Sequence, residues 1–171
     1  RDRCATFTSI PYPHKSIHFA TMANGGAEFL RVVRDAGLGV FVNSLGHLET
    51  CHEVGFHGAD IVYTASAMYD ARMEVCHQRE LVLNLDSVGQ LERWWDRFPE
   101  APVGVRCNIG TLVTPRETRG GYFLGPESRL GLSVDELQAL GGSPNVSGLH
   151  LYLGTDITDV AYFEECYNHV V

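Results

Sequence analysis

Two charged side chains stand where short apolar runs of the sequence end. Arg106 lies near the end of the run Val103–Cys107, and Asp86 follows the run Leu81–Leu85. An arginine that points into a protein interior is costly unless it pairs with a carboxylate or holds an anion. Arg106 is therefore the first candidate for a ligand-binding residue, whereas we expect Asp86 to cap the helix that begins after it.

Histidine and cysteine could supply metal ligands. His47 and Cys51 would share one face of a helix, at a spacing that suits a metal ion. However, Cys51 also completes an apolar helical stripe, and no carboxylate or second cysteine stands at ligand spacing. We expect no metal site. His18 and His150 are expected to be hydrogen-bonded core residues.

The apolar runs alternate with segments of helical periodicity, which predicts an α/β fold with a parallel sheet and right-handed crossovers. An open doubly wound sheet and a (β/α) barrel both satisfy this pattern. Six runs are predicted to be strands: Ile17–Ala23, Gly39–Asn43, Ile61–Ala65, Leu81–Leu85, Val103–Cys107 and Gly148–Leu153.

Side-chain alternation within the runs favours the barrel. One parity is aliphatic and the other becomes small or polar toward the strand end, where barrel enzymes build their sites. Six units are present and a closed barrel has eight. We therefore expect residues 1–171 to be one partial (β/α)8 TIM-barrel domain, with the remaining units outside this chain.

Two segments resemble capping boxes that open helices, Ser87–Gln90 and Ser133–Glu136. Between them lies the long irregular stretch Ile109–Gly131, which is rich in glycine and arginine. A loop of this length is usually functional or mobile, and the sequence leaves both interpretations open.

Composition narrows the class of partner. The chain of 171 residues has a formal net charge of −8, which argues against a nucleic-acid or anionic-membrane surface. No apolar run is long enough to span a bilayer. Five dispersed cysteines without a Cys-x-x-Cys motif are typical of a reducing compartment, so we expect a cytoplasmic protein.

Seven segments in order resemble the fold-type III decarboxylases that use pyridoxal phosphate and act on diaminopimelate, ornithine or arginine, with an alanine racemase-like barrel. Phe19-Ala20-Thr21-Met22-Ala23-Asn24 is similar to the family pattern Tyr-Ala-x-Lys-Ala-Asn, and Asn43–Glu49 to Val-Ser-x-Gly-Glu-(Leu/Ile)-Glu. The other matching segments are Asp60–Ala65, Asn84–Ser87, Arg106–Asn108, Ser128–Gly131 and Gly148–Thr155.

The resemblance implies roles for single residues. Met22 stands where the family has its Schiff-base lysine, and a thioether cannot form an imine. Tyr152 stands where a histidine stacks on the cofactor ring, so these two are the candidate catalytic positions. Ala20, Arg106 and Thr155 are the further candidates for contacts with the cofactor, which Tyr152 would also contact.

Two further features bear on that chemistry. Phe41 replaces an acidic residue of the second strand of the family. Lys15 is the only lysine of the chain, and it precedes the first predicted strand. Because several extended residues separate it from position 22, we expect no covalent attachment of pyridoxal phosphate.

The resemblance implies a decarboxylase-like lyase of amino-acid metabolism that removes the α-carboxylate of a basic or diamino acid. It also implies a homodimer, in which a C-terminal β-domain outside this chain completes each site. Its ligand would be an amino acid or amine. Two alternatives remain at this point: a non-catalytic pseudoenzyme that binds a ligand or partner, and another phosphate- or metal-using barrel enzyme.

Overall fold

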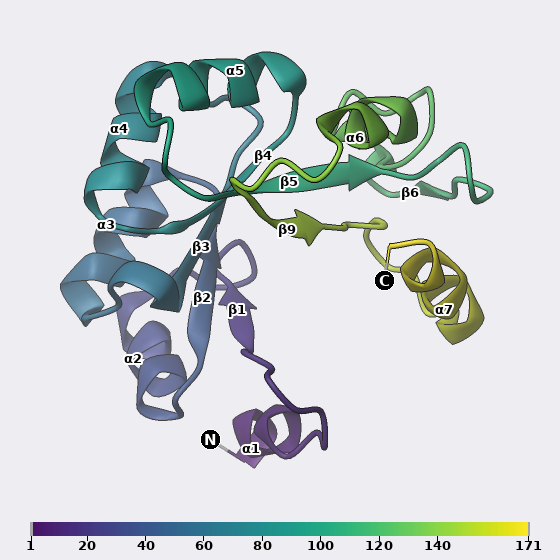
Figure 1. Ribbon diagram of the computed structural model, residues 1–171. Coiled ribbons are helices and arrows are strands. Elements are labelled where there is room, and N and C mark those ends of the chain that lie inside the picture. The colour runs from purple at the N-terminus through teal and green to yellow at the C-terminus, as the bar shows by residue number, and fades with distance from the viewer. Residues whose placement is uncertain (1, 171) are drawn as a thin grey trace. The chain divides into compact units, whose positions relative to one another are not determined.

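The computed structural model describes residues 2–170, and the chain forms two compact units, Arg1–Leu83 and Asn84–Val171 (Figure 1). Strand β4 (Val82–Leu85) crosses the boundary between them. Each unit contains parallel strands joined by helices, as the alternation of apolar runs and helical segments predicts.

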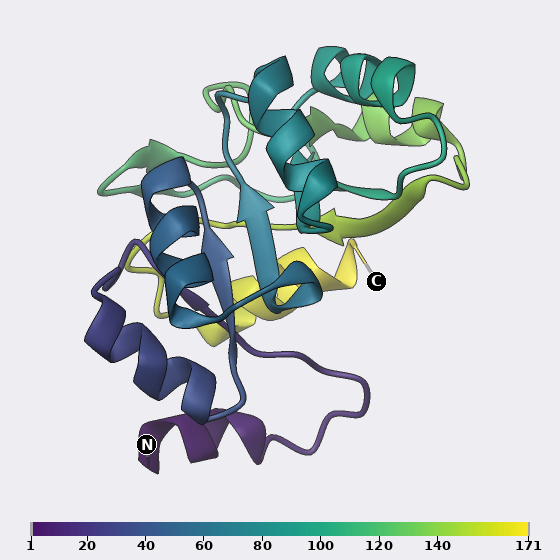
Figure 2. The ribbon, with the colours of Figure 1, turned by 90° about the vertical axis from the view of Figure 1, so that its left-hand side faces the viewer.

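The first unit is built on three parallel strands, β1 (His18–Ala20), β2 (Gly39–Val42) and β3 (Ile61–Thr64). In the register of this sheet, His18 is opposite Gly39 and Val40 is opposite Ile61. Helices α2 and α3 lie on the same side of these strands in both ribbon views (Figures 1 and 2). The helices of this unit are α1 (Asp2–Thr8), α2 (Ala27–Asp35), α3 (Leu45–Val54), the 3-10 helix η1 (Gly58–Asp60) and α4 (Asp70–Gln78).

The core of the first unit follows the predicted periodicity. Val40 and Val42 of β2 are fully buried, as are Leu48 and Cys51 on one stripe of α3. Helix α3 ends at Gly55, which adopts a left-handed conformation with φ of 103°. This conformation suits glycine and satisfies the last carbonyls of the helix.

The second unit is organised around β5 (Val103–Asn108). On one edge β5 pairs in parallel with the end of β4, and it also pairs in parallel with β8 (Leu132–Ser133) and β9 (Val146–His150). The remaining elements are α5 (Val88–Arg97), the antiparallel strands β6 (Glu117–Thr118) and β7 (Gly121–Tyr122), α6 (Val134–Leu140) and α7 (Val160–Asn168).

Two details of the second unit differ from the sequence-based expectations. The sixth predicted strand, Gly148–Leu153, is shifted: β9 begins at Val146 and ends at His150, so Tyr152 lies beyond the strand. Strand β8 was not predicted, because a two-residue run is too short to show an alternation.

The irregular stretch Ile109–Gly131 packs against the core of the second unit. It contains the β6–β7 hairpin, and Ile109, Val113 and Leu124 are buried in a cluster with Cys107 of β5 and Tyr162 of α7. The apolar side chains inside the loop therefore anchor it to its own unit.

One of the two predicted capping boxes forms. The Ser133 hydroxyl accepts from the Glu136 amide, and the Glu136 carboxylate accepts from the Ser133 amide at 2.7 Å. The box predicted at Ser87–Gln90 is wrong, because the Gln90 side chain accepts from the backbone N–H of Asp86 at 2.8 Å instead. Across residues 2–170, no helix has the length and apolar character needed to cross a membrane.

Candidate cofactor site

The turn after β1 carries Met22 at the surface of the first unit. Thr21 is fully buried, and its amide and its hydroxyl both donate to the carbonyl of Phe41, at 3.0 and 3.2 Å. The Ala23 amide closes the turn by donating to Ala20. Met22 itself is 69% exposed, so the turn is held by its neighbours and not by the methionine.

His47 holds the same turn from the other side. Its Nδ1 lies 3.1 Å from the Thr21 hydroxyl oxygen. Because the single hydroxyl proton of Thr21 is directed to Phe41, Nδ1 of His47 is the donor in this contact. The backbone of His47 is fixed in turn by the N-cap Ser44 of α3, whose hydroxyl accepts from the His47 amide.

A steric constraint explains why glycine stands at position 25, just after this turn. A Cβ atom at Gly25 would lie 2.8 Å from Nε2 of His47, closer than van der Waals contact permits. The breaker Asn24-Gly25-Gly26 thus allows the imidazole to approach the backbone closely. In the family pattern of this segment the position of His47 is a glutamate, so Met22, Phe41 and His47 are three neutral or weakly basic replacements in one unit.

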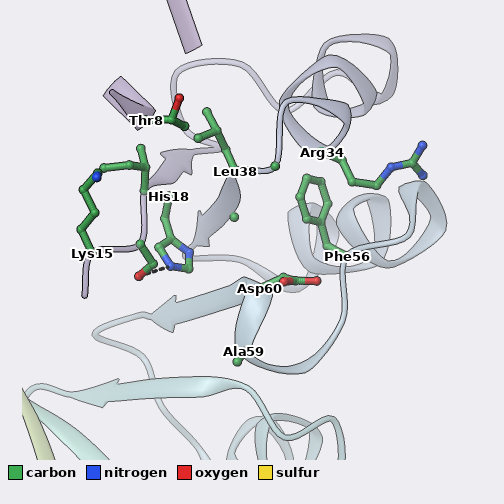
Figure 3. Close-up of a pocket in the computed structure, with 12 residues that line it drawn as sticks. Thr8, Lys15, His18, Arg34, Leu38, Phe56, Ala59 and Asp60 are labelled. Atoms are coloured by element: carbon green, nitrogen blue, oxygen red, sulfur yellow. Dashed lines mark hydrogen bonds between the residues drawn. The ribbon is translucent and has the colours of Figure 1, made fainter. Parts of the chain in front are cut away.

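Lys15 lies before β1, whereas Met22 follows it. Figure 3 shows Lys15 beside a cavity of about 420 Å³ in the first unit, with His18, Leu38 and Asp60 among its lining. The Lys15 amine donates to the Tyr12 carbonyl at 3.4 Å, and Nε2 of His18 contacts the Ser16 hydroxyl. The only lysine of the chain is therefore separated from position 22 by the whole of β1.

In the second unit, Arg106 and Asp86 form a buried ion pair. Arg106 is 7% exposed and Asp86 4%, and Nη1 of the guanidinium lies 3.6 Å from Oδ1 of the carboxylate. The expectation that Asp86 caps α5 is wrong, because the N-cap is Ser87 and the Asp86 side chain turns to the interior. Burial lowers the pKa of Arg106, and the Asp86 charge opposes this effect.

His150, at the end of β9, belongs to the same cluster. Burial and the nearby Arg106 charge lower the pKa of His150 to about 4, and Asp86 partly offsets them. The imidazole is therefore neutral near pH 7. Arg106 and Asp86 remain as one positive and one negative charge.

Tyr152 joins the cluster from the segment after β9. Its ring lies 5.7 Å from Cζ of Arg106, and its hydroxyl lies 3.0 Å from the hydroxyl oxygen of Thr155. Phe123, from the loop 109–131, contacts the Tyr152 ring edge-on at a centroid distance of 4.9 Å. Three of the predicted site residues, Arg106, Tyr152 and Thr155, are thus brought together in the second unit.

The other predicted positions, Ala20 and Met22, lie in the first unit at the end of β1 and in the turn after it. Sequence reasoning did not place Asp86 beside Arg106 and gave no role to Thr21 or Phe123. For Asp86 a signal existed, because its position at the carboxyl end of a strand matches that of Arg106. Within residues 2–170, no group of three His, Cys, Asp or Glu side chains is placed to hold a metal ion.

Comparisons with known proteins identify the relatives of the chain. The family model of the pyridoxal-dependent decarboxylases, pyridoxal binding domain, matches residues 2–171. The diaminopimelate decarboxylase of Bacteroides thetaiotaomicron is 23% identical over 93% of this chain and 44% of its own length. That of Escherichia coli K12 is 27% identical over 87% of this chain and 37% of its own length.

Solved structures share the fold. A single-residue mutant of diaminopimelate decarboxylase from Helicobacter pylori, complexed with L-lysine, superposes with a TM-score of 0.79 at 16% identity, over 99% of this chain and 46% of that one. Lysine decarboxylase from Selenomonas ruminantium gives 0.76 at 20% identity, over 99% and 44%. The fold class of this chain is therefore α/β of the TIM-barrel type, and the chain forms part of such a barrel.

The chain spans less than half the length of these relatives. The match to the family model nevertheless extends over the whole described chain. The chain belongs to the pyridoxal-dependent decarboxylase family, and the model of the pyridoxal binding domain matches its residues 2–171.

Proposed function

We propose that this chain is the cofactor-binding part of a decarboxylase-like protein that holds pyridoxal phosphate without a covalent bond. The observation that carries the proposal is the pairing of Met22 with a chain that has no lysine beyond Lys15. A thioether cannot form an imine with the cofactor aldehyde. Membership of the pyridoxal-dependent decarboxylase family implies that the cofactor is pyridoxal phosphate. Met22 replaces the lysine that would bind this cofactor covalently.

The remaining candidate residues fit the cofactor better than position 22 does. Pyridoxal phosphate, when bound, supplies the electron sink for the loss of an α-carboxylate. The aromatic face of Tyr152 could stack on its ring, and the buried Arg106 offers a fixed positive charge. The hydroxyl of Thr155 could donate to a phosphate.

The relatives support a substrate class for this chain. Diaminopimelate and L-lysine are named for the related proteins, which supports a basic or diamino acid, or the corresponding amine, as the ligand here. The same family relation supports a homodimer, a cytoplasmic location and a single partial barrel domain over residues 1–171.

A non-catalytic binding protein is the second candidate function. It is favoured by the joint replacement of the family lysine, acidic residue and glutamate by Met22, Phe41 and His47. Thr21, the neighbour of Met22, bonds to the backbone carbonyl of Phe41 and to the side chain of His47, so the three replaced positions lie around one turn.

Reductive trapping tests the proposal. The purified protein is mixed with pyridoxal 5′-phosphate, its absorbance is recorded, and it is then treated with borohydride, desalted and mapped by mass spectrometry. We expect reversible binding with no trapped adduct at any site residue. The variant Lys15→Arg removes the only side-chain amine and thus controls for incidental labelling outside the site.

The variant Met22→Lys, made in the Lys15→Arg background, is the positive control. It should acquire the absorbance of an imine and one reducible adduct at residue 22. A stoichiometric adduct elsewhere in the unmodified protein would contradict non-covalent binding. No retention of pyridoxal phosphate at all would favour the binding-protein candidate.

A further inference from the structure

The cavity of about 420 Å³ in the first unit lies at the amino ends of three parallel strands. His18 begins β1, Gly39 begins β2 and Asp60 directly precedes β3, and all three line the cavity. The candidate cofactor positions Ala20 and Met22 lie at the carboxyl end of β1 and in the turn after it. Cavities of this size commonly hold a small molecule, so the cavity is a candidate site for a second ligand.

The amine of Lys15 lines one side of this cavity. Among residues 2–170, no carboxylate lies within ion-pair distance of it, and the side chain is half-buried. Its hydrogen bond to the Tyr12 carbonyl is long, at 3.4 Å, and an ammonium group has three N–H donors. A half-buried cation with unused donors favours the binding of an anion.

Polar groups that follow Lys15 in the chain extend the same side. Nε2 of His18 lies 3.2 Å from the Ser16 hydroxyl, and both residues line the cavity. The imidazole packs directly on β2, because a Cβ atom at Gly39 would overlap its Nδ1. Glycine at position 39 thus holds the imidazole and the hydroxyl beside the amine.

The rest of the lining is largely apolar. Leu38 is 8% exposed and Phe56 1%, and the half-buried Ile17 lines the same cavity. Figure 3 shows Lys15 and Phe56 on opposite sides of Leu38. A ligand in the cavity therefore meets a cation at one end and hydrocarbon along its body.

The other charges of the lining limit the ligand to one negative charge. Arg34 also lines the cavity, but its guanidinium donates to the Asp35 carboxylate at 2.9 Å. The exposed Asp60 adds a negative charge, and its carboxylate accepts from the His57 amide at 3.4 Å. Asp60 would repel a phosphate dianion, which Lys15 would neutralise only in part, whereas a single carboxylate matches the single ammonium.

We propose that this cavity binds a small organic acid, whose carboxylate accepts from the Lys15 amine and whose apolar body packs on Leu38 and Ile17. The only lysine of the chain is then a ligand-binding residue. The inference does not depend on pyridoxal phosphate, because none of the candidate cofactor residues lines the cavity.

A matched pair of ligands tests the site without any mutation. 3-Phenylpropionate and 3-phenylpropanamide have the same body, and the second replaces the carboxylate by a neutral amide. Their affinities for the purified protein are measured by ligand-observed NMR. We expect a Kd on the order of a millimolar for the acid and an affinity about three- to tenfold above that of the amide. Equal affinities, or no binding of the acid, would overturn the proposal.

A second measurement places the acid. Because Lys15 is the only lysine, protein labelled with ε-¹³C-lysine gives one lysine side-chain signal. The acid should shift this signal with the same Kd, and the shift should shrink at high salt because the ion pair is screened. A bound acid that leaves the signal in place would overturn the assignment to this cavity.

Variants assign the preference to the charge of Lys15. Lys15→Met keeps the length of the side chain and removes its charge, so the preference for acid over amide should fall to about one. Lys15→Arg restores a cation and should keep part of the preference. Arg31→Met is the matched control, because it removes an exposed cation of α2 outside the cavity lining, and it should leave the preference unchanged. A full preference in Lys15→Met would show that the carboxylate binds elsewhere and would overturn the proposal.

Discussion

The hydroxyl of Thr21 lies 3.1 Å from Nδ1 of His47, and this contact ties the turn that carries Met22 to the first turn of α3. The same hydroxyl donates to the Phe41 carbonyl, so one buried side chain connects three segments of the first unit. The geometry at position 22 is therefore set by its neighbour in the sequence.

Replacing Thr21 by valine keeps the shape of the side chain and removes its hydroxyl. We expect a loss of about 1 to 3 kcal/mol in the free energy of unfolding, because the part-buried Nδ1 of His47 loses its partner and the Phe41 carbonyl keeps only the amide of residue 21. Urea denaturation measures this loss. Thr50→Val, which removes a hydroxyl bonded to the Gly46 carbonyl of its own helix, is the matched control and should change stability much less. Equal effects of the two variants would show that the Thr21 contacts add nothing.

The low pKa of His150 predicts a pH dependence of stability. This pKa is about 4 in the folded protein and about 6.5 in the unfolded chain. Below pH 6.5 the unfolded chain binds a proton that the folded protein does not, so the free energy of unfolding falls as the pH is lowered toward 4 and then levels off. The loss should reach up to about 3 kcal/mol.

Urea unfolding of the unmodified protein and of His150→Gln, at intervals between pH 7 and pH 4, measures this contribution. The difference between the two proteins should change over that window only. His77→Gln, which removes an exposed histidine, should keep the pH dependence of the unmodified protein. An unchanged dependence in His150→Gln would assign the effect to other groups.

Packing of the loop 109–131 is testable by a pair of leucine substitutions. Leu124 is 2% exposed and Leu112 is 44% exposed, although both lie in the same loop. Leu124→Ala should cost about 2 to 5 kcal/mol of stability, as expected for a large buried side chain. Leu112→Ala should stay within about 0.5 kcal/mol. Chemical denaturation and limited proteolysis measure both, and a mobile loop would make the two variants alike.

Asp159 has two roles at the start of α7, and two variants separate them. Its Oδ1 accepts from the amides of Ala161 and Tyr162, and its Oδ2 accepts from Arg116 at 2.7 Å. Asp159→Asn keeps a good N-cap and loses the ion pair, whereas Asp159→Ala loses both. The alanine variant should therefore melt at the lower temperature of the two. An equal melting temperature would mean that the cap contributes nothing.

Asp159 also makes the stability depend on pH, but here the folded protein favours the charged form of the side chain, whereas at His150 it favours the neutral form. The Arg116 hydrogen bond and charge, together with the helix amides, hold the pKa of this carboxyl below its usual range. Its contribution is present above the ordinary pKa of an aspartate and is lost as the pH falls through the lowered value. Asp159→Asn should remove that acidic component of the melting curve.

The pattern of apolar runs was enough to predict the parallel sheet and most of its strands, whereas the family came from the resemblance of seven segments. Periodicity is a local property, and buried positions such as Val40 and Leu48 follow it. The resemblance also gave Arg106, Tyr152 and Thr155, which the structure brings together in one unit.

What the sequence did not give depends on contacts between distant residues. Asp86 was expected to cap α5, because a carboxylate just before a helix is usually a cap. Its actual partner, Arg106, comes from the next strand, and the Gln90 side chain takes the Asp86 amide instead of closing the predicted box. Likewise, the Thr21 hydroxyl has partners on β2 and α3 that no local pattern indicates.

The close approach of His47 to Gly25 has a practical consequence for engineering. A larger residue at position 25 would displace the imidazole, whereas the exposed side chain at position 22 can be exchanged with little effect on its surroundings. Position 22 is thus a preformed mounting point, at which a nucleophile, a spectroscopic label or an unnatural amino acid could be installed on a turn whose conformation is already determined by other residues.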